Sequence, residues 1–325
     1  MNNWLGFQIE YLLLLQNFRE MTHGVFDWFF GHITMFGEYC FAMLIVAFFY
    51  WIIDKKCGIF MYWNLFGGIL VNQFIKITAC IYRPWILDGR IHPVVSAMKK
   101  ATGYSFPSGH TAIATGTYGA LVLSFWKNKI IRYLLITFIL LIGFSRNYLG
   151  VHTPQDVLVS LILGALILFG TSKVLKWVES GKNRDLIVFG VVLSLGALLL
   201  VYTQLKHYPV DYLNGVILVN PEDMRYESFP KAGFVIGAFF GWLLERRFIK
   251  FEAPKGSVWA KFGIYLVGAV ILCFLQGKLT SLFMMHLSAP IARFTSCLLI
   301  SLFVTAIYPS VINGYNELNK KKTAC

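Results

Sequence analysis

Long apolar runs dominate the chain and are separated by short polar stretches. A helix that crosses the hydrocarbon core of a bilayer needs about 20 mainly apolar residues, and nine segments meet that requirement. They are roughly residues 33–53, 57–81, 107–126, 130–146, 156–178, 185–205, 229–245, 258–276 and 289–312. Residues 4–19 are shorter and interrupted by polar side chains, which favours an interfacial amphipathic helix. The pattern predicts an all-α protein, a polytopic transmembrane helical bundle with about nine spans and an N-terminal interfacial helix.

The composition agrees with a location in a membrane. Of the 325 residues, 57% are hydrophobic and only 14% are charged, whereas a globular chain carries roughly 25% charged residues. So many apolar side chains cannot be hidden from water inside a soluble particle of this size. The composition therefore excludes soluble enzymes, and a multi-pass protein of the cell membrane is expected.

Basic residues outnumber acidic ones by 29 to 16, which gives a net charge of +13. This excess requires no nucleic acid partner, because Lys and Arg collect in cytoplasmic loops near anionic membrane lipids. Suppose that one membrane face is formed by the segments 54–57, 127–132, 173–185, 246–261 and the C-terminus. That face would then hold 17 of the 29 basic residues, including Lys255 and Lys320 to Lys322. We therefore expect this face to be cytoplasmic. The loops expected outside are 82–106, 147–155, 206–228 and 277–288.

Three short segments place polar residues where a membrane helix should exclude them. The first is Lys76-x6-Arg83-Pro84, near the outer end of the second predicted span. Seven residues are nearly two helical turns, so both cations are expected on one face of the helix. The alternative is that two long side chains extend to the membrane interface for solvation.

The second segment, Tyr104-Ser105-Phe106-Pro107-Ser108-Gly109-His110, leads from an outer loop into the third predicted span. A proline followed by Ser108 and Gly109 at a helix start leaves several backbone N–H groups available, and such a start can bind an anion. Gly109 would let a phosphate approach the backbone closely. The alternative is an ordinary helix cap in which His110 is a polar residue at the interface.

The third segment, Ser145-Arg146-x5-His152-Thr153-Pro154-Gln155-Asp156, joins the fourth and fifth predicted spans. Thr153 and Pro154 are typical of an N-cap and a first helical residue, so Asp156 fits the carboxylate of a capping box. The functional alternative is that Asp156 accepts a hydrogen bond from one ring nitrogen of His152. That bond would fix the tautomer and make the other nitrogen more nucleophilic.

All three segments fall on the membrane face that the charge distribution assigns to the outside. Together they supply three cations, two histidines, one carboxylate and a set of backbone N–H groups. This set suffices for phosphoryl transfer without a metal, because it offers charge clamps, a nucleophile with an orienting partner and a proton donor. No Asp, Glu and His residues show metal-ligand spacing, so neither a metal nor another cofactor is expected.

These segments resemble the tripartite signature of the type 2 phosphatidic acid phosphatase superfamily, which reads Lys-x6-Arg-Pro, Pro-Ser-Gly-His and Ser-Arg-x5-His-x3-Asp. Every signature position is occupied, and the resemblance covers residues 33 to about 178. The integral membrane members are lipid phosphatases, while soluble acid phosphatases and vanadium haloperoxidases share the same site. Since the apolar content excludes the soluble branches, the resemblance implies a membrane lipid phosphatase.

The resemblance also implies a role for each signature residue. His152 is similar to the nucleophile that forms a phosphohistidine intermediate, Asp156 to its orienting partner, and His110 to the general acid that protonates the leaving oxygen. The other signature residues resemble groups that bind the phosphoryl oxygens, namely the clamps Lys76, Arg83 and Arg146 and the oxyanion donors Ser108 and Gly109.

The chain is expected to contain three parts. They are an N-terminal interfacial segment at 1–32, a catalytic lipid phosphatase core at 33–180 and an additional transmembrane region of unknown role at 181–325. The N-terminal segment lacks the features of a cleaved signal peptide and is expected to be retained. It also departs from the six-span layout of the family, which leaves the entry route of the lipid open.

Two features outside the signature have more than one interpretation. Glu38 lies in an apolar run, where it is either a functional carboxylate within the membrane or a residue near the outer headgroups. Gly233, Gly237 and Gly241 repeat at one-turn spacing, which favours close helix packing within the chain or, alternatively, a homodimer seam.

The expected function is hydrolysis of a lipid phosphate or lipid pyrophosphate at the extracytoplasmic face. Undecaprenyl pyrophosphate is the first choice of substrate, because this carrier is released on the outer leaflet and must lose a phosphate before reuse. Phosphatidylglycerophosphate and phosphatidate follow, and this ranking depends on family analogy. A lipid phosphotransferase using the same intermediate is one alternative, and a lipid transporter is another.

Overall fold

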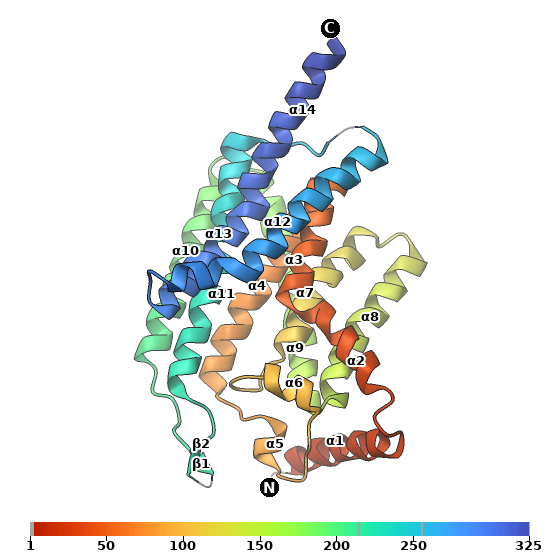
Figure 1. Cartoon of the computed structure of the whole chain (residues 1–325), viewed down its shortest axis with the longest axis vertical. Helices are drawn as coiled ribbons and strands as arrows, with labels where there is room; N and C mark the ends of the chain where they lie inside the picture. The colour runs from red at the N-terminus through yellow and green to blue at the C-terminus, as the bar shows by residue number, and fades with distance from the viewer. Residues whose placement is uncertain (1–2, 214, 255, 325) are drawn as a thin grey trace. The chain divides into compact units, whose positions relative to one another are not determined.

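The computed structural model describes residues 3–213, 215–254 and 256–324, and most of this part is helical (Figure 1). The longer helices are α1 (Asn3–Met21), α3 (Tyr39–Phe48), α4 (Lys55–Ala79), α7 (Gly109–Ser124), α8 (Lys129–Tyr148), α9 (Pro154–Glu179), α10 (Arg184–Leu205), α11 (Pro221–Leu244), α12 (Val258–Met284), α13 (Ala289–Leu302) and α14 (Tyr308–Ala324). The shorter elements are α2 (Asp27–Ile33), η1 (Thr34–Gly37), η2 (Phe49–Ile53), α5 (Pro84–Leu87), α6 (Val95–Lys100), β1 (Tyr212–Leu213), β2 (Val216–Ile217), η3 (Glu245–Ile249) and η4 (Phe303–Ile307). Lys255, predicted to be cytoplasmic, lies outside the described residues, as do Met1 and Asn2 and the side chains of Lys320 to Lys322.

The architecture confirms the predicted all-α fold with several membrane-spanning helices. Six helical segments in the described ranges are long and apolar enough to cross a membrane. They are Lys55–Leu87, Lys129–Tyr148, Pro154–Glu179, Arg184–Leu205, Val258–Met284 and Ala289–Glu317. A bent pair of helices, Asp27–Gly37 with Tyr39–Ile53, would raise the number to seven.

Two of the nine predicted spans do not meet this standard, so the number nine is not confirmed. Helix α7 has only 16 residues, although most of them are buried. Helix α11 is long enough, but its first turn carries Glu222 and Asp223 and further charged residues follow. A helix buried in protein needs apolar side chains just as one buried in lipid does, so hydropathy alone does not separate the two cases.

The chain divides into two compact units. The first comprises Met1–Ala42, Val71–Leu168 and Leu205–Arg225, and the second comprises Met43–Leu70, Phe169–Gln204 and Tyr226–Cys325. All eight residues predicted for the site belong to the first unit. The boundary expected near residue 180 stays a prediction.

Helix α7 is the central helix of the first unit, and its residues from Thr111 to Val122 are buried. Glycines on the neighbouring helices allow the close approach. A Cβ added to Gly143 of α8 would lie 2.8 Å from Val157, and one added to Gly164 of α9 would overlap the side chain of Thr115. Substitution at either glycine would therefore separate helices whose ends carry the second and third signature segments.

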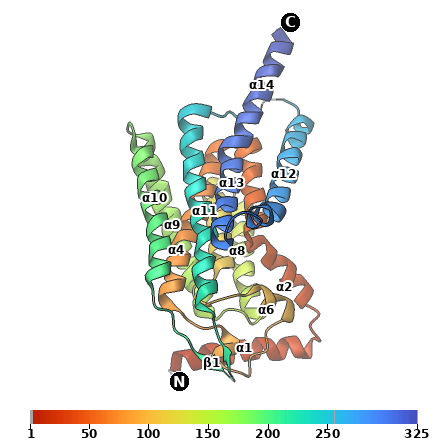
Figure 2. The same ribbon diagram turned by 60° about the vertical axis from the view of Figure 1, so that its left-hand side comes forward.

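Helix α1 lies crosswise to α8 in both views of the molecule (Figures 1 and 2) and packs against it. The side chain of Gln8 accepts a hydrogen bond from the backbone N–H of Gln155 at 3.0 Å, and that of Gln16 accepts one from the backbone N–H of His92 at 2.7 Å. Its other face exposes the apolar side chains of Trp4, Phe7, Leu14 and Phe18. These are the properties expected of an interfacial helix that is held against the protein.

In the second unit, the three regularly spaced glycines lie against a helix of the same chain. A Cβ added to Gly233 or Gly237 would overlap the backbone carbonyls of Phe294 or Leu298 in α13. The glycines therefore allow α11 and α13 to pack backbone against backbone. The homodimer seam stays a prediction.

Candidate active site

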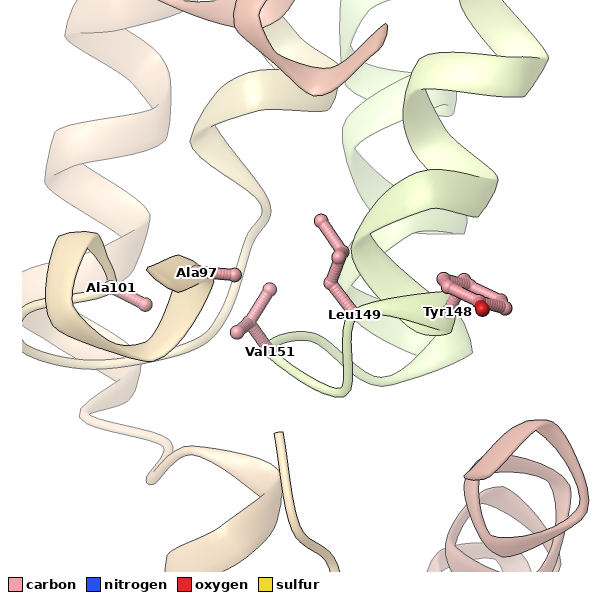
Figure 3. Close-up of a cluster of buried hydrophobic side chains, with 5 residues drawn as sticks. All are labelled: Ala97, Ala101, Tyr148, Leu149 and Val151. Atoms are coloured by element: carbon pink, nitrogen blue, oxygen red, sulfur yellow. The ribbon is translucent and has the colours of Figure 1, made fainter. Parts of the chain in front are cut away.

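The loop that carries His152 is short and held by apolar packing. It joins α8 to α9, and its residues Leu149 and Val151 belong to a buried cluster with Ala97 of α6 and Ala101, the residue that follows α6 (Figure 3). Gly150 has a φ of +73°, a conformation that other residues adopt only with strain. The backbone around His152 is therefore fixed before any substrate binds.

His152 and Asp156 are paired, as the spacing of the third segment suggested. The Nδ1 atom of His152 lies 3.1 Å from Oδ2 of Asp156, and both side chains are almost completely buried. Ser105 completes the group, because its hydroxyl donates to the same Oδ2 at 2.5 Å and lies 3.3 Å from Nδ1. The three side chains form one buried polar cluster.

Arg83 contacts the other ring nitrogen of His152. Its Nη1 lies 2.9 Å from Nε2. The same guanidinium donates to the backbone carbonyls of Thr102, Gly103 and Val151, at 2.9, 3.1 and 3.0 Å. Because a guanidinium can only donate, Nε2 is the nitrogen without a proton, and Nδ1 carries the proton that it donates to Asp156. This tautomer leaves on Nε2 the lone pair that an attack on phosphorus requires.

The surroundings keep the imidazole of His152 neutral. Burial lowers its pKa well below the ordinary value of 6.5, and the nearby cations of Arg83, Arg146 and Lys76 lower it further. A histidine with a lowered pKa loses its proton at a more acidic pH than usual. His152 therefore stays neutral, and able to act as a nucleophile, at pH values below the normal titration range of histidine.

Asp156 also acts as the carboxylate of a capping box, which was the alternative interpretation of its place in the sequence. Its Oδ2 accepts the backbone N–H of Thr153 at 2.9 Å, and its own backbone N–H donates to Oγ1 of Thr153 at 3.3 Å. This reciprocal pair is a capping box at the start of α9. One carboxylate thus fixes the helix start and orients His152, so the two interpretations are compatible.

Lys76, predicted as a phosphate clamp, lies beneath the second segment. Its ammonium donates to the backbone carbonyls of Tyr104, Ser105 and Pro107, at 3.0, 3.2 and 3.1 Å, and its side chain is buried. An ammonium has three N–H donors, and the three carbonyls match that number. Lys76 therefore fixes the loop that carries Ser105, and its role as a clamp stays a prediction.

The second segment forms the N-terminus of α7. Ser108 is the N-cap, and its hydroxyl oxygen accepts from the backbone N–H of Thr111 at 3.4 Å. The backbone N–H of Ser108 donates to the carbonyl of Asp156 at 3.1 Å, which connects the starts of α7 and α9. A Cβ added to Gly109 would meet no atom within 4 Å, so there is room for a ligand beside the backbone, as the prediction requires.

Arg146 has donors left for a ligand. Its Nη1 donates to Oγ1 of Thr34 at 2.8 Å, and the residue is only 3% exposed. Its Nε is buried and has no hydrogen-bond partner among the described residues. A buried guanidinium N–H without a partner is unfavourable, and a phosphoryl oxygen would satisfy it.

Comparison with known proteins assigns the chain to a family. The PAP2 superfamily matches residues 37–180, and a second description, PAP2 superfamily phosphatase, transmembrane extension, matches residues 229–319. Undecaprenyl-diphosphatase BcrC of Bacillus subtilis is 30% identical over 139 residues, which are 42% of this chain and 68% of that protein. The chain belongs to the PAP2 superfamily.

The match to two further relatives of this PAP2 protein covers a smaller share of their length. An undecaprenyl-diphosphatase of Sulfolobus acidocaldarius is 32% identical over 115 residues, which are 35% of this chain and 53% of that protein. Phosphatidylglycerophosphatase B of Bacillus subtilis is 32% identical over 123 residues, which are 34% of this chain and 60% of that protein. No solved structure matches the chain. These findings confirm the predicted family and the predicted class of enzyme, a membrane hydrolase of lipid phosphates or diphosphates.

The general acid expected in a PAP2 site is His110, the second residue of α7. Its Nε2 lies 4.0 Å from Oε1 of Glu38, and the same Oε1 accepts a hydrogen bond from Nζ of Lys100 at 3.0 Å. Glu38, for which the sequence left two interpretations open, thus lies beside a signature histidine. Gly37 allows this approach, because a Cβ there would lie 2.9 Å from the carbonyl oxygen of His110.

Sequence reasoning assigned no role to two residues of this PAP2 site. Ser105 lies inside the second segment, so its place three residues before the N-cap was a usable signal. Thr34, the partner of Arg146, lies 112 residues away from it in sequence, and no sequence pattern marks it. Within the described ranges, no group of three or more His, Cys, Asp or Glu residues is placed to hold a metal ion.

Proposed function

We propose that the protein hydrolyses a lipid phosphate or lipid pyrophosphate through a phosphohistidine on Nε2 of His152. The observation that carries this proposal is that the two ring nitrogens of His152 have different partners, Asp156 at Nδ1 and Arg83 at Nε2. Asp156 holds the proton on Nδ1 at 3.1 Å, and Nε2 keeps its lone pair on the side of Arg83. This is the arrangement that nucleophilic catalysis by a neutral imidazole needs.

The reaction takes two steps. In the first, Nε2 bonds to phosphorus and the bond between phosphorus and the leaving oxygen breaks, while His110 gives that oxygen a proton. In the second, a water molecule gives a proton back to His110 and attacks phosphorus. The bond between phosphorus and Nε2 then breaks, which releases inorganic phosphate and restores His152.

Arg83 has to change partners before the first step. In the structure its Nη1 donates to the lone pair on Nε2, so a phosphoryl oxygen has to take over this N–H group. The planar fork of arginine suits two phosphoryl oxygens at once. Arg146 would contribute its buried Nε donor, so that the two arginines stabilise the charge that develops on the phosphoryl group.

Among lipid phosphates, undecaprenyl pyrophosphate is the proposed substrate. Two relatives that are 30% and 32% identical are named undecaprenyl-diphosphatases. A third relative, 32% identical, is named phosphatidylglycerophosphatase B, so phosphatidylglycerophosphate is the second choice and phosphatidate the third. The distribution of basic residues supports an active site on the extracytoplasmic face of the cell membrane.

A panel of lipid substrates tests this proposal. The purified full chain in detergent micelles should release inorganic phosphate from undecaprenyl pyrophosphate with the highest kcat/KM of the three lipids. Release should continue in EDTA, because the cations of the site are side chains. Phosphate that appears on an added acceptor would indicate a phosphotransferase, and loss of turnover in EDTA that magnesium restores would contradict the mechanism.

The membrane face can be tested by labelling of single cysteines. In a variant without the six native cysteines, Gly89→Cys should react with an impermeant maleimide in intact cells, because residue 89 is exposed in a predicted outer loop. Lys127→Cys, in the exposed turn between α7 and α8, should react only after lysis. The reverse pattern would place the site in the cytoplasm and favour phosphatidate or phosphatidylglycerophosphate as substrate.

A further inference from the structure

A cavity of about 320 Å³ lies beside the signature residues, in the first unit. It is bounded by α2, η1, α6 and the end of α8. The helical turn η1 ends at Gly37, and the backbone of Glu38 is extended, with φ of −92° and ψ of 150°. The helical path of the chain is therefore interrupted at Glu38, which lines this cavity.

Four polar residues of the cavity wall belong to the catalytic group or contact it. They are Arg146, Thr34, Glu38 and Lys100. Arg146 brings the buried Nε that has no hydrogen-bond partner in the described part of the chain, and Glu38 connects Lys100 to His110. A phosphate that binds Arg146 would therefore lie in or directly beside this cavity.

The remaining wall of the cavity combines polar and apolar residues. Asp27, His32 and Ser96 are polar, and Trp28, Val94, Ala97 and Leu149 are apolar. Trp28 is 72% exposed, so it lies at the mouth and not in the interior. Val25, Phe26 and Phe29, which surround Trp28 in sequence, are also exposed apolar residues. A mouth surrounded by such side chains is adapted to contact with lipid.

The size of the cavity limits what it can hold. A volume of 320 Å³ lies at the lower end of the range for small-molecule sites, roughly 300–1,000 Å³. It accommodates a phosphate group and the first carbons of a lipid, whereas a complete acyl or polyprenyl chain is much larger. The distal part of the chain would have to stay in the bilayer.

We propose that this cavity is the lateral portal through which a lipid phosphate reaches His152. The phosphate binds at Arg146, the first carbons of the lipid lie between Trp28 and Leu149, and the rest of the chain leaves through the mouth beside α2. The inference rests on the proposed function, since it concerns how the substrate of that reaction enters. It also provides an entry route in the part of the chain where the N-terminal segment departs from the family layout.

Gly31 allows a direct test of the portal. It lines the cavity, and a Cβ added there would meet no atom within 4 Å, so a larger side chain enters the space without colliding with the protein. Gly31→Leu should lower kcat/KM for undecaprenyl pyrophosphate and for phosphatidate by at least about tenfold. Gly31→Ala, which adds one methyl group, should give a smaller loss in the same direction.

The effect should be confined to the lipid. The inhibition constant of inorganic phosphate, measured on the residual turnover of Gly31→Leu, should stay within about twofold of the wild-type value because Arg83 and Arg146 are unchanged. Gly170→Leu is the matched control, since Gly170 is a helical glycine of α9 whose Cβ position is also open. This control should have the wild-type kcat/KM.

Each result bears on one of the two proposals. Wild-type kcat/KM in Gly31→Leu would overturn the portal and leave the phosphatase function intact. A parallel weakening of phosphate inhibition would also overturn it, because the cavity would then belong to the phosphate site itself. Failure of the wild-type enzyme to hydrolyse any lipid phosphate would instead refute the proposed function.

Discussion

Replacing His152 by alanine should reduce turnover of a lipid phosphate by at least about 10³-fold, because the nucleophile is removed. The alanine variant should still bind the headgroup. Arg83 and Arg146 do not depend on the imidazole for their position, since Arg83 retains three backbone carbonyl partners and Arg146 retains Thr34. The expected result is therefore a loss of kcat with little change in substrate affinity.

Single-turnover experiments measure this directly. Substrate labelled with ³²P should transfer label to the wild-type protein within the first turnover, and the labelled bond should be acid-labile, as a phosphoramidate is. The His152→Ala variant should acquire no label. His92→Ala is a suitable control, because His92 is exposed in the loop before α6 and should leave turnover unchanged. More than a few per cent of wild-type activity in His152→Ala would mean that another residue is the nucleophile.

Asp156→Asn should also lower kcat, by less than His152→Ala does; replacing an orienting carboxylate by an amide can cost up to about 10⁴-fold in kcat. Oδ2 of Asp156 accepts from Nδ1 of His152 and from Ser105 and Thr153. An amide nitrogen in that place would donate to Nδ1, so the proton would move to Nε2 and the lone pair would be lost. The effect should be milder than that of His152→Ala, since the nucleophile is present in its less reactive tautomer.

The capping role of Asp156 must be separated from its catalytic role. Weakening a helix cap costs about 1 kcal/mol of stability, which lowers Tm without changing kcat of the folded enzyme. Ser105→Ala provides a second variant, since it removes one donor to Oδ2 and leaves both the carboxylate and the cap in place. It should give a smaller loss of kcat than Asp156→Asn. A lowered Tm with wild-type kcat in Asp156→Asn would show that Asp156 is only a cap.

The sequence predicted the local parts of this site well. His152 and Asp156 are four residues apart on either side of a helix start, so their contact followed from helical geometry. The capping box was readable from Thr153 and Pro154 for the same reason. Contacts of this kind depend on neighbouring residues and on the known path of the backbone between them.

The sequence could not predict which groups accept hydrogen bonds from the clamp residues Lys76 and Arg83. Lys76 reaches three backbone carbonyls about 30 residues further along the chain, and Arg83 reaches Val151 across 68 residues. Backbone carbonyls are present at every residue, so a sequence carries no sign of which of them will be turned toward a cation. Only the tertiary packing that brings these distant segments together places them there.

The shortness of α7 has a consequence for the lipid around the protein. Its 16 residues extend about 24 Å at 1.5 Å per residue, whereas the hydrocarbon core of a bilayer is about 30 Å thick. Its far end is followed by Trp126 and Lys127, residue types that settle at the headgroup level. If α7 is taken as a membrane span, as the sequence predicts, its N-terminus with Ser108 and Gly109 would lie about 6 Å below the opposite headgroups, and tilting the helix would increase that depth. The membrane would then have to thin at this point, or the phosphate would have to descend by that distance, at a cost of a fraction of a kcal/mol per Å. Bilayer thickness would thereby become part of the energy barrier to substrate entry.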